Sequence, residues 1–194
     1  MDKLSIEDLY SLEEYARHRA EFRSRVIEHK RHRRLALGEH LTLCFEDRLT
    51  IRYQVQEMLR VERIFEEEGI RAELDAYNPL IPDGKNWKAT LLIEYPDPAE
   101  RDRELRRLVG IEHRVWLQVD GHEPVTAIAD EDLERSTTEK TSSVHFLRFE
   151  LSPAMIRSLK SGALLRAGVD HPGCSVRLES VPELLRESLV ADLE

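Results

Sequence analysis

Alternating hydrophobic and polar positions predict several β-strands along this chain. In the segment HLTLCFE, the side chains of Leu41, Leu43 and Phe45 fall on one side, which is the period of a strand with one buried face. Similar segments flank Asp-Gly at 120–121 and His-Pro-Gly at 171–173, so each of these turns is expected to close a hairpin. The predicted strands cover residues 40–46, 87–95, 114–119, 125–129, 144–151, 163–170 and 174–180.

Apolar positions spaced by three and four residues predict the helices. Ser5 and Ser11 each stand three residues before an acid, an arrangement that caps helix N-termini, so we expect a short helix and then a long one to about Arg33. A helix over residues 54–69, ended by Gly69, follows the first strand. Further helices are expected at residues 71–77, 98–108 and 153–162, and near the C-terminus.

The order of these elements predicts the fold class. Strands and helices are mixed, and hairpins dominate the second half, which favours an α+β fold over a doubly wound one. We expect a mainly antiparallel sheet with packed helices and a long N-terminal basic helix. A length of 194 residues suits one domain. Residues 1–194 are therefore predicted to form a single domain, with residues 5–34 as an N-terminal helical extension.

Glu62 is placed by this pattern in the middle of an apolar helix face. The apolar residues that share the face at 100° per residue are Ile51, Val55, Met58, Leu59, Val61 and Phe65. A buried carboxylate has to be protonated, paired or bound to a metal. We expect Glu62 to be buried and to accept hydrogen bonds from an arginine, such as Arg148 or Arg52. The alternatives are a metal or acid–base centre shared with Glu66, one turn further on, and simple exposure of Glu62 to solvent.

His145 and the turn VDHPGC carry the other candidate chemistry. His145 lies on a mostly apolar strand face, where a histidine is either a hydrogen-bonded core residue or a ligand. Asp170, His171 and Cys174 lie together in the turn, which either only reverses the chain or offers an imidazole and a thiolate to a metal. If Glu62 and His145 joined His171 and Cys174, a mixed Glu/His/Cys site for zinc, iron or manganese would result.

The segment NPLIPDGKN at residues 78–86 predicts an ordered loop, because it contains two prolines and an Asp-Gly pair. Its polar groups include Asn78, Asp83 and Lys85. Rigid polar loops either border a pocket or only turn the chain, and both alternatives stay open here. The familiar nucleotide-binding, serine-hydrolase and zinc-protease motifs, and the Glu-x-x-His pair of di-iron bundles, do not occur in the sequence.

Charge is distributed unevenly along the chain. The formal net charge is −9, yet residues 17–34 hold eight Lys or Arg against Glu21 and Glu28. Such a basic helix is either solvated, docked on an acidic surface of the same chain, or bound to a protein partner. Nucleic acid is the disfavoured alternative, because the acidic remainder of the chain would repel phosphates.

The compartment follows from the apolar runs and the cysteines. No apolar run approaches the roughly 20 residues that span a bilayer, so no membrane insertion is expected. The first residues, MDKLSIEDLYSLEEY, contain acids where a secretory signal has a basic region, so a cytoplasmic location is predicted. Cys44 and Cys174 are 130 positions apart and form no CxxC pair, which favours free thiols.

Several strings resemble a bacterial family that is catalogued only as a domain of unknown function. They are QEMLRVERIFEEEGIRAELDAYNPLIPDGKNWKATLLIEYPD, AIADEDLER, KTSSVHFLRFEL and GVDHP, and the resemblance runs from LYSLEEY over nearly the whole chain. Members of that family are often encoded beside rubrerythrin-like proteins and iron-sulfur oxidoreductases. The resemblance therefore implies a place in peroxide or redox metabolism, with a protein partner of that kind.

Two functions from different classes are expected from these observations. The first is an accessory or binding protein of a redox or oxidative-stress system, as the resemblance implies. The second is a metal-binding protein, or a metal-dependent enzyme, with the mixed Glu/His/Cys site. The sequence alone leaves open whether the protein is an enzyme.

Overall fold

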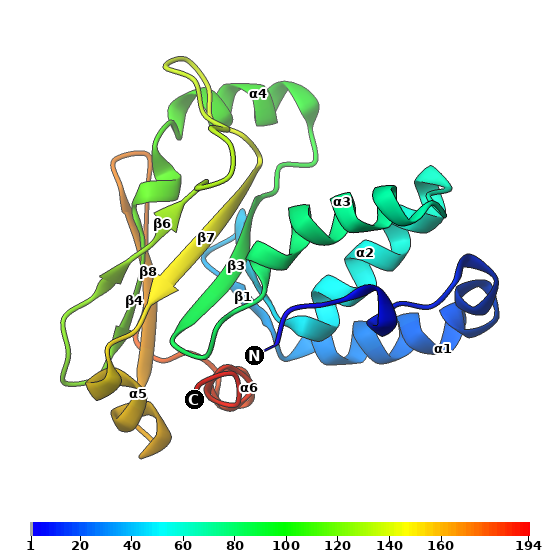
Figure 1. The fold of residues 1–194 in the computed structure, drawn as a ribbon. Helices are drawn as coiled ribbons and strands as arrows, with labels where there is room; N and C mark the ends of the chain where they lie inside the picture. Colours follow the sequence, from blue (N-terminus) through cyan, green and yellow to red (C-terminus); the bar gives the residue numbers. More distant parts are fainter. Residues whose placement is uncertain (1) are drawn as a thin grey trace.

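Two antiparallel β-sheets form the centre of the molecule (Figure 1). The computed structural model describes residues 2–194. The first sheet has the order β1-β2-β3-β7-β6, and the second has the order β5-β4-β8-β9. The strands are β1 (Arg34–Ala36), β2 (Leu41–Glu46), β3 (Asn86–Ile93), β4 (Val115–Val119), β5 (Val125–Thr126), β6 (Ile128–Ala129), β7 (Val144–Glu150), β8 (Leu165–His171) and β9 (Cys174–Leu178).

The helices lie around these sheets, and together they confirm the predicted α+β class. They are η1 (Ile6–Asp8), α1 (Leu12–Arg31), α2 (Arg48–Glu62), α3 (Glu67–Tyr77), η2 (Asn78–Leu80), α4 (Pro98–Arg107), η3 (Ile111–His113), α5 (Pro153–Lys160) and α6 (Glu183–Val190). The predicted hairpins at 120–121 and 171–173 are both present, joining β4 to β5 and β8 to β9. Across residues 2–194, every helix is too short or too polar to serve as a membrane span.

Side chains from both sheets share one hydrophobic core. Leu43 of β2, Leu91 of β3 and Leu117 of β4 belong to a single buried cluster. The alternation predicted for β2 is confirmed, because Leu41, Leu43 and Phe45 are buried while the residues between them are half-buried. His145 points to the same inner face of the first sheet, and its direct cross-strand neighbour is Leu91. A polar ring is therefore buried within the core.

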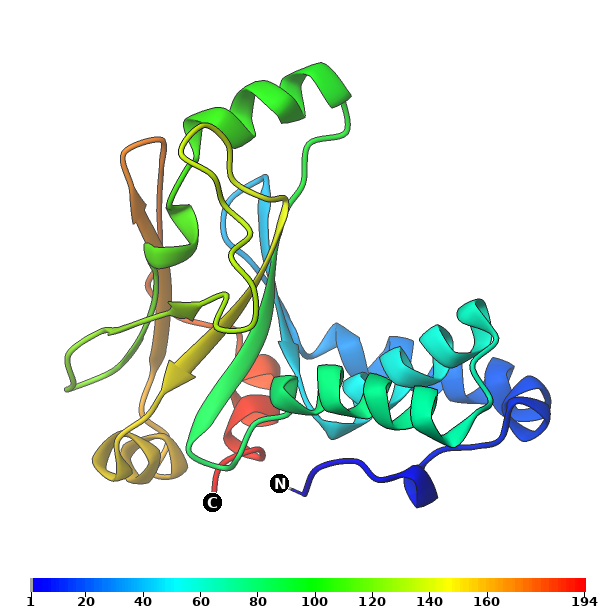
Figure 2. The ribbon, with the colours of Figure 1, turned by 45° about the horizontal axis from the view of Figure 1, so that its top comes forward.

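Helices α1, α2 and α3 form an arm that projects to one side of the sheets, as Figures 1 and 2 show. The arm has small apolar clusters of its own, one around Tyr15, Phe22 and Val26 of α1, and one that includes Ile51 and Val55 of α2. Ser11 caps α1 as predicted, since its hydroxyl accepts the Glu14 N–H and the Glu14 carboxylate accepts the Ser11 N–H.

The helix predicted over residues 54–69 is two helices. Helix α2 ends at Glu62, because Arg63 adopts a left-handed conformation with φ 57°, and α3 begins at Glu67. Gly69 therefore lies inside α3. A Cβ at Gly69 would lie 2.7 Å from the Ile64 side chain, so the glycine is needed for a close approach and not for ending a helix. The apolar stripe ends where α2 ends, so Val61 is 62% and Phe65 is 70% exposed.

Part of the basic segment binds acids of the same chain. The guanidinium of Arg19 donates to both oxygens of Glu57 on α2, at 2.7 and 2.8 Å, and the Tyr15 hydroxyl donates to the same carboxylate at 2.7 Å. Arg33 is only 2% exposed and pairs with Asp192 at the end of α6. It also donates to the carbonyl of Phe45 on β2. These contacts hold the arm, the first sheet and α6 together.

The Glu57 carboxylate predicts a measurable pH dependence. Hydrogen bonds from Arg19, and then from Tyr15 and Arg60, lower the pKa of Glu57 to about 2. Its stabilisation is therefore fully present above the ordinary pKa of about 4.5 and is lost as the pH falls toward 2. We expect Glu57→Gln to lower the free energy of unfolding by about 1 to 2 kcal/mol at pH 7, as measured by urea denaturation.

The control is Glu62→Gln, which changes an exposed carboxylate on the same helix. It should change the free energy of unfolding at pH 7 by less than about 0.5 kcal/mol. The difference between wild type and Glu57→Gln should shrink as the pH falls from about 5 to 2. A difference that stays constant over this range would show that the ionised carboxylate is not the stabilising group.

Candidate functional site

Three titratable side chains meet at one end of the sheet core. Glu112 comes from η3, Asp130 follows β6, and His145 comes from β7. One ligand-type atom from each lies within 4.8 Å of the others, and in residues 2–194 this is the sole group of three or more His, Cys, Asp or Glu with that property. Their side chains are 4%, 8% and 0% exposed, respectively. We call Glu112, Asp130 and His145 the Glu–Asp–His cluster.

The His145 ring is held from both sides. Its Nδ1 lies 2.6 Å from Oδ2 of Asp130, so the Nδ1 proton donates to that carboxylate. Its Nε2 lies 2.9 Å from the Thr141 hydroxyl and 3.1 Å from the Ser142 carbonyl oxygen. A carbonyl only accepts hydrogen bonds. Nε2 is therefore satisfied by a second proton, by the Thr141 hydroxyl proton, or by a metal ion.

Glu112 is buried on the Nε2 side of the ring. Its Oε1 accepts a hydrogen bond from the Ser136 hydroxyl at 2.5 Å, and its Oε2 lies 3.3 Å from the Thr141 hydroxyl. Oε2 is also 3.9 Å from Nε2 of His145. Burial alone raises the pKa of Glu112, but the Ser136 hydrogen bond and the nearby His145 outweigh it, so that the net pKa lies below the usual value. The carboxylate is thus ionised inside the protein.

Asp130 is fixed by the backbone of β7. It adopts a positive φ of 51°, a conformation that aspartate tolerates better than most residues. Its backbone N–H donates to the Phe146 carbonyl at 2.8 Å, and its Oδ1 accepts the Phe146 N–H at 3.0 Å. Arg135 lies 3.4 Å from the same Oδ1 and stacks over the Phe146 ring. The orientation of the Asp130 carboxylate toward His145 is therefore fixed by contacts other than the one with His145 itself.

Of the sequence-predicted candidates, His145 is in the cluster and buried, while Glu62, Glu66 and Asp170 are exposed. The expected burial of Glu62 is wrong, because α2 ends at that residue. The expected pairing of Glu62 with Arg148 or Arg52 is wrong as well. Arg148 pairs with Glu131 and Glu150, and the Arg52 guanidinium stacks over Tyr10.

His171 and Cys174 form a turn instead of a metal site. The Nδ1 of His171 accepts the Gly173 N–H, and its Nε2 donates to the Val109 carbonyl, each at 3.0 Å. Both ring nitrogens are thus satisfied by backbone groups. Burial raises the pKa of the Cys174 thiol, which disfavours the thiolate that binds metals. The mixed site with Glu62 and His145 does not form within residues 2–194.

The polar groups of the 78–86 loop hold the chain in place. The Asn78 amide forms two hydrogen bonds with the backbone of Leu4, at 2.8 and 2.9 Å. Asp83 accepts the N–H of Lys85 within the turn, at 2.9 Å. The loop also borders a cavity, but through the apolar residues Pro79 and Leu80.

The cluster predicts a strong dependence of stability on Asp130. Asp130→Ala removes the acceptor of the buried His145 Nδ1 and of the Phe146 N–H. It also leaves alanine at a positive φ. We expect the free energy of unfolding to fall by about 2 to 4 kcal/mol in urea denaturation. Glu134→Ala, an exposed acid in the same loop, should change it by less than about 0.5 kcal/mol. Equal effects of the two substitutions would contradict the importance of the buried hydrogen bonds.

Comparison with known proteins gives a family and a close structural neighbour. The profile of a family described as "Protein of unknown function (DUF3501)" matches residues 3–193. A crystal structure of a protein of unknown function from Burkholderia pseudomallei K96243 is similar over 100% of both chains, with a TM-score of 0.95 and 54% sequence identity. No curated protein matches the chain. The comparisons therefore support the fold and the family.

Proposed function

We propose that this chain, which belongs to the DUF3501 family of proteins of unknown function, is a metal-binding protein whose ion is held at the Glu–Asp–His cluster. The observation that carries the proposal is the arrangement of donor atoms around Nε2 of His145. Thr141 Oγ1, the Ser142 carbonyl oxygen and Glu112 Oε2 lie 2.9, 3.1 and 3.9 Å from Nε2. Ligands with metal bonds of about 2.1 Å are spaced by about 3 to 4 Å.

Asp130 takes the positioning role in this proposal. Metal-binding histidines commonly donate the N–H of the other ring nitrogen to a carboxylate, which fixes the ring. The hydrogen bond from His145 Nδ1 to Asp130 has that form. Glu112 and His145 Nε2 would then be the direct ligands, with the Thr141 and Ser142 oxygens beside them.

The charges and the donor types support a divalent ion. Glu112 and Asp130 bring two buried carboxylates, and Arg135 lies 3.4 Å from Asp130. A divalent cation would offset the remaining negative charge. One imidazole nitrogen with oxygen donors and no thiolate suits zinc, iron or manganese. Side chains that are at most 8% exposed favour an ion held within the structure over one that a substrate must reach.

The test is elemental analysis of protein purified without a metal-affinity tag. We expect close to one zinc, iron or manganese per chain in the wild type, and its loss in Glu112→Gln and His145→Gln. His171→Ala is the matched control and should keep the ion, because His171 binds only backbone groups. Adding the metal back at 100 times its Kd should raise the free energy of unfolding by about 2.7 kcal/mol.

Two results would overturn the proposal. One is wild-type protein that carries no metal and whose unfolding midpoint does not change on addition of zinc, iron or manganese. The other is a bound metal that Glu112→Gln and His145→Gln retain at the wild-type level.

We also propose that the protein acts in the cytoplasm beside a redox or oxidative-stress partner, either an iron-sulfur oxidoreductase or a rubrerythrin-like protein. The proposal rests on the family resemblance, and free thiols at Cys44 and Cys174 suit a reducing compartment. The tip of the helical arm offers a contact surface, because Val61 and Phe65 are large apolar residues that are mostly exposed.

Titration calorimetry with each purified candidate partner tests this second role. We expect micromolar binding that Phe65→Ser weakens at least tenfold, since Phe65 would be buried in the complex. Leu184→Ser, which changes another exposed apolar residue, on α6, should bind like the wild type. Wild-type protein that binds neither partner would contradict the role.

A further inference from the structure

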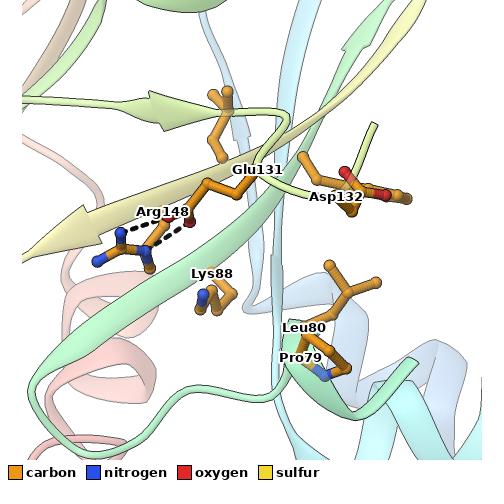
Figure 3. A pocket seen from close by; sticks show the side chains of 8 residues that line it. Pro79, Leu80, Lys88, Glu131, Asp132 and Arg148 are labelled. Atoms are coloured by element: carbon orange, nitrogen blue, oxygen red, sulfur yellow. Dashed lines mark hydrogen bonds and ion pairs between the residues drawn. The ribbon is translucent and has the colours of Figure 1, made fainter. Parts of the chain in front are cut away.

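A cavity of about 250 Å³ opens on the outer face of the first sheet, the face opposite the shared core. Figure 3 shows Lys88 of β3 between the Glu131–Arg148 pair on one side and Pro79 and Leu80 on the other. Phe146 of β7 also lines the cavity. The lining thus combines apolar side chains with Lys88 and with three further charged residues, Glu131, Asp132 and Arg148.

The ammonium group of Lys88 forms no direct ion pair with an acid in residues 2–194, although carboxylates lie around it. Its two direct cross-strand neighbours are Arg148 on β7, another cation, and Glu46 on β2, whose carboxylate accepts hydrogen bonds from the hydroxyls of Thr50 and Thr90. Two further acids, Glu131 and Glu150, act on the charge of Lys88 but are bound by that arginine, since Arg148 donates to Glu131 at 2.6 and 2.7 Å and also pairs with Glu150. Within residues 2–194, Lys88 makes neither a side-chain hydrogen bond nor an ion pair.

Such a position is unfavourable for a lone cation. Lys88 is half-buried, and burial, followed by the adjacent Arg148, lowers the pKa of its ammonium group. A desolvated charge is stabilised when an opposite charge is brought within a few ångströms. The cavity leaves room for such a group directly above Lys88, so an anionic ligand would supply the missing partner.

We propose that this cavity binds a small monocarboxylate with an apolar body, whose carboxylate pairs with Lys88 and whose hydrocarbon part lies against Pro79, Leu80 and Phe146. Small-molecule sites generally combine apolar walls with a few polar groups that fix orientation. The volume equals that of about eight water molecules, so a ligand of about eight or nine non-hydrogen atoms fits.

The surrounding charges favour a single negative charge over two. Lys88 is the one cation of the lining without an acid partner, since Arg148 is already paired. The carboxylates of Glu131 and Asp132 stand at the same cavity, and a phosphate dianion would meet their repulsion. The proposal stands on this cavity alone and does not depend on a metal at the Glu–Asp–His cluster.

Benzoate is the probe, because it has nine non-hydrogen atoms, one charge and an apolar ring. Its binding is followed by amide chemical shifts in NMR titrations of the full chain. We expect shifts centred on β3 and β7, a Kd that rises at least tenfold in Lys88→Met, and no saturable binding of the neutral analogue benzyl alcohol. Lys85→Met, an exposed lysine three residues away, should keep the wild-type Kd.

A second variant tests the same cavity with Lys88 in place, in case Lys88→Met does not fold. Leu80→Glu places a carboxylate in the half-buried wall opposite Lys88 and should abolish benzoate binding by repulsion, while urea denaturation confirms that each variant is folded. The proposal is overturned if wild-type protein shows no saturable shifts with benzoate at millimolar concentrations. It is also overturned if Lys88→Met and wild type bind benzoate equally, or if inorganic phosphate binds at Lys88 more tightly than benzoate.

Discussion

A fully buried histidine in the shared sheet core is the constraint that organises the candidate site. An imidazole among leucines is tolerated only when both ring nitrogens have partners, because each unpaired polar atom in the interior costs about 1 to 3 kcal/mol. His145 lies opposite Leu91, so its partners have to come from outside the sheet. They are supplied by Asp130 on one side of the ring and by Thr141 and Ser142 on the other.

This requirement explains the shape of the segment between β6 and β7. Asp130 takes a left-handed conformation and is bound at both backbone and side chain to Phe146, which aims its carboxylate at the ring. Ser136 in the middle of the segment and Thr141 near its other end both reach Glu112. A polar stretch is therefore anchored at its start, its middle and near its end by one buried network. The same network holds the donor atoms on which the proposed metal binding rests.

The sequence predicted elements well where local pattern decides them, and sites poorly where distant residues decide them. Alternation identified β2, and turn chemistry identified the β8–β9 hairpin. The helical spacing of apolar residues continues past Glu62, but the helix itself ends there, because Arg63 adopts a left-handed conformation. No local sequence signal marks this end. His145 was identified as a candidate because it is a polar residue on a mostly apolar strand face. Glu112 and Asp130 were missed, since they lie in short polar segments whose burial arises only when the two sheets pack together.

The buried pair of Arg33 and Asp192 joins groups that are 159 positions apart. The guanidinium also pairs with Asp47, at 3.3 Å, which is synthesised soon after it. At about 5 to 20 residues per second, Asp192 follows Arg33 only after roughly 10 to 30 seconds. The α1–α2 contacts, including Arg19 with Glu57, need only the first third of the chain and can form while translation continues. The arm can thus fold early on the ribosome, whereas its contacts with the sheets are completed only when α6 emerges.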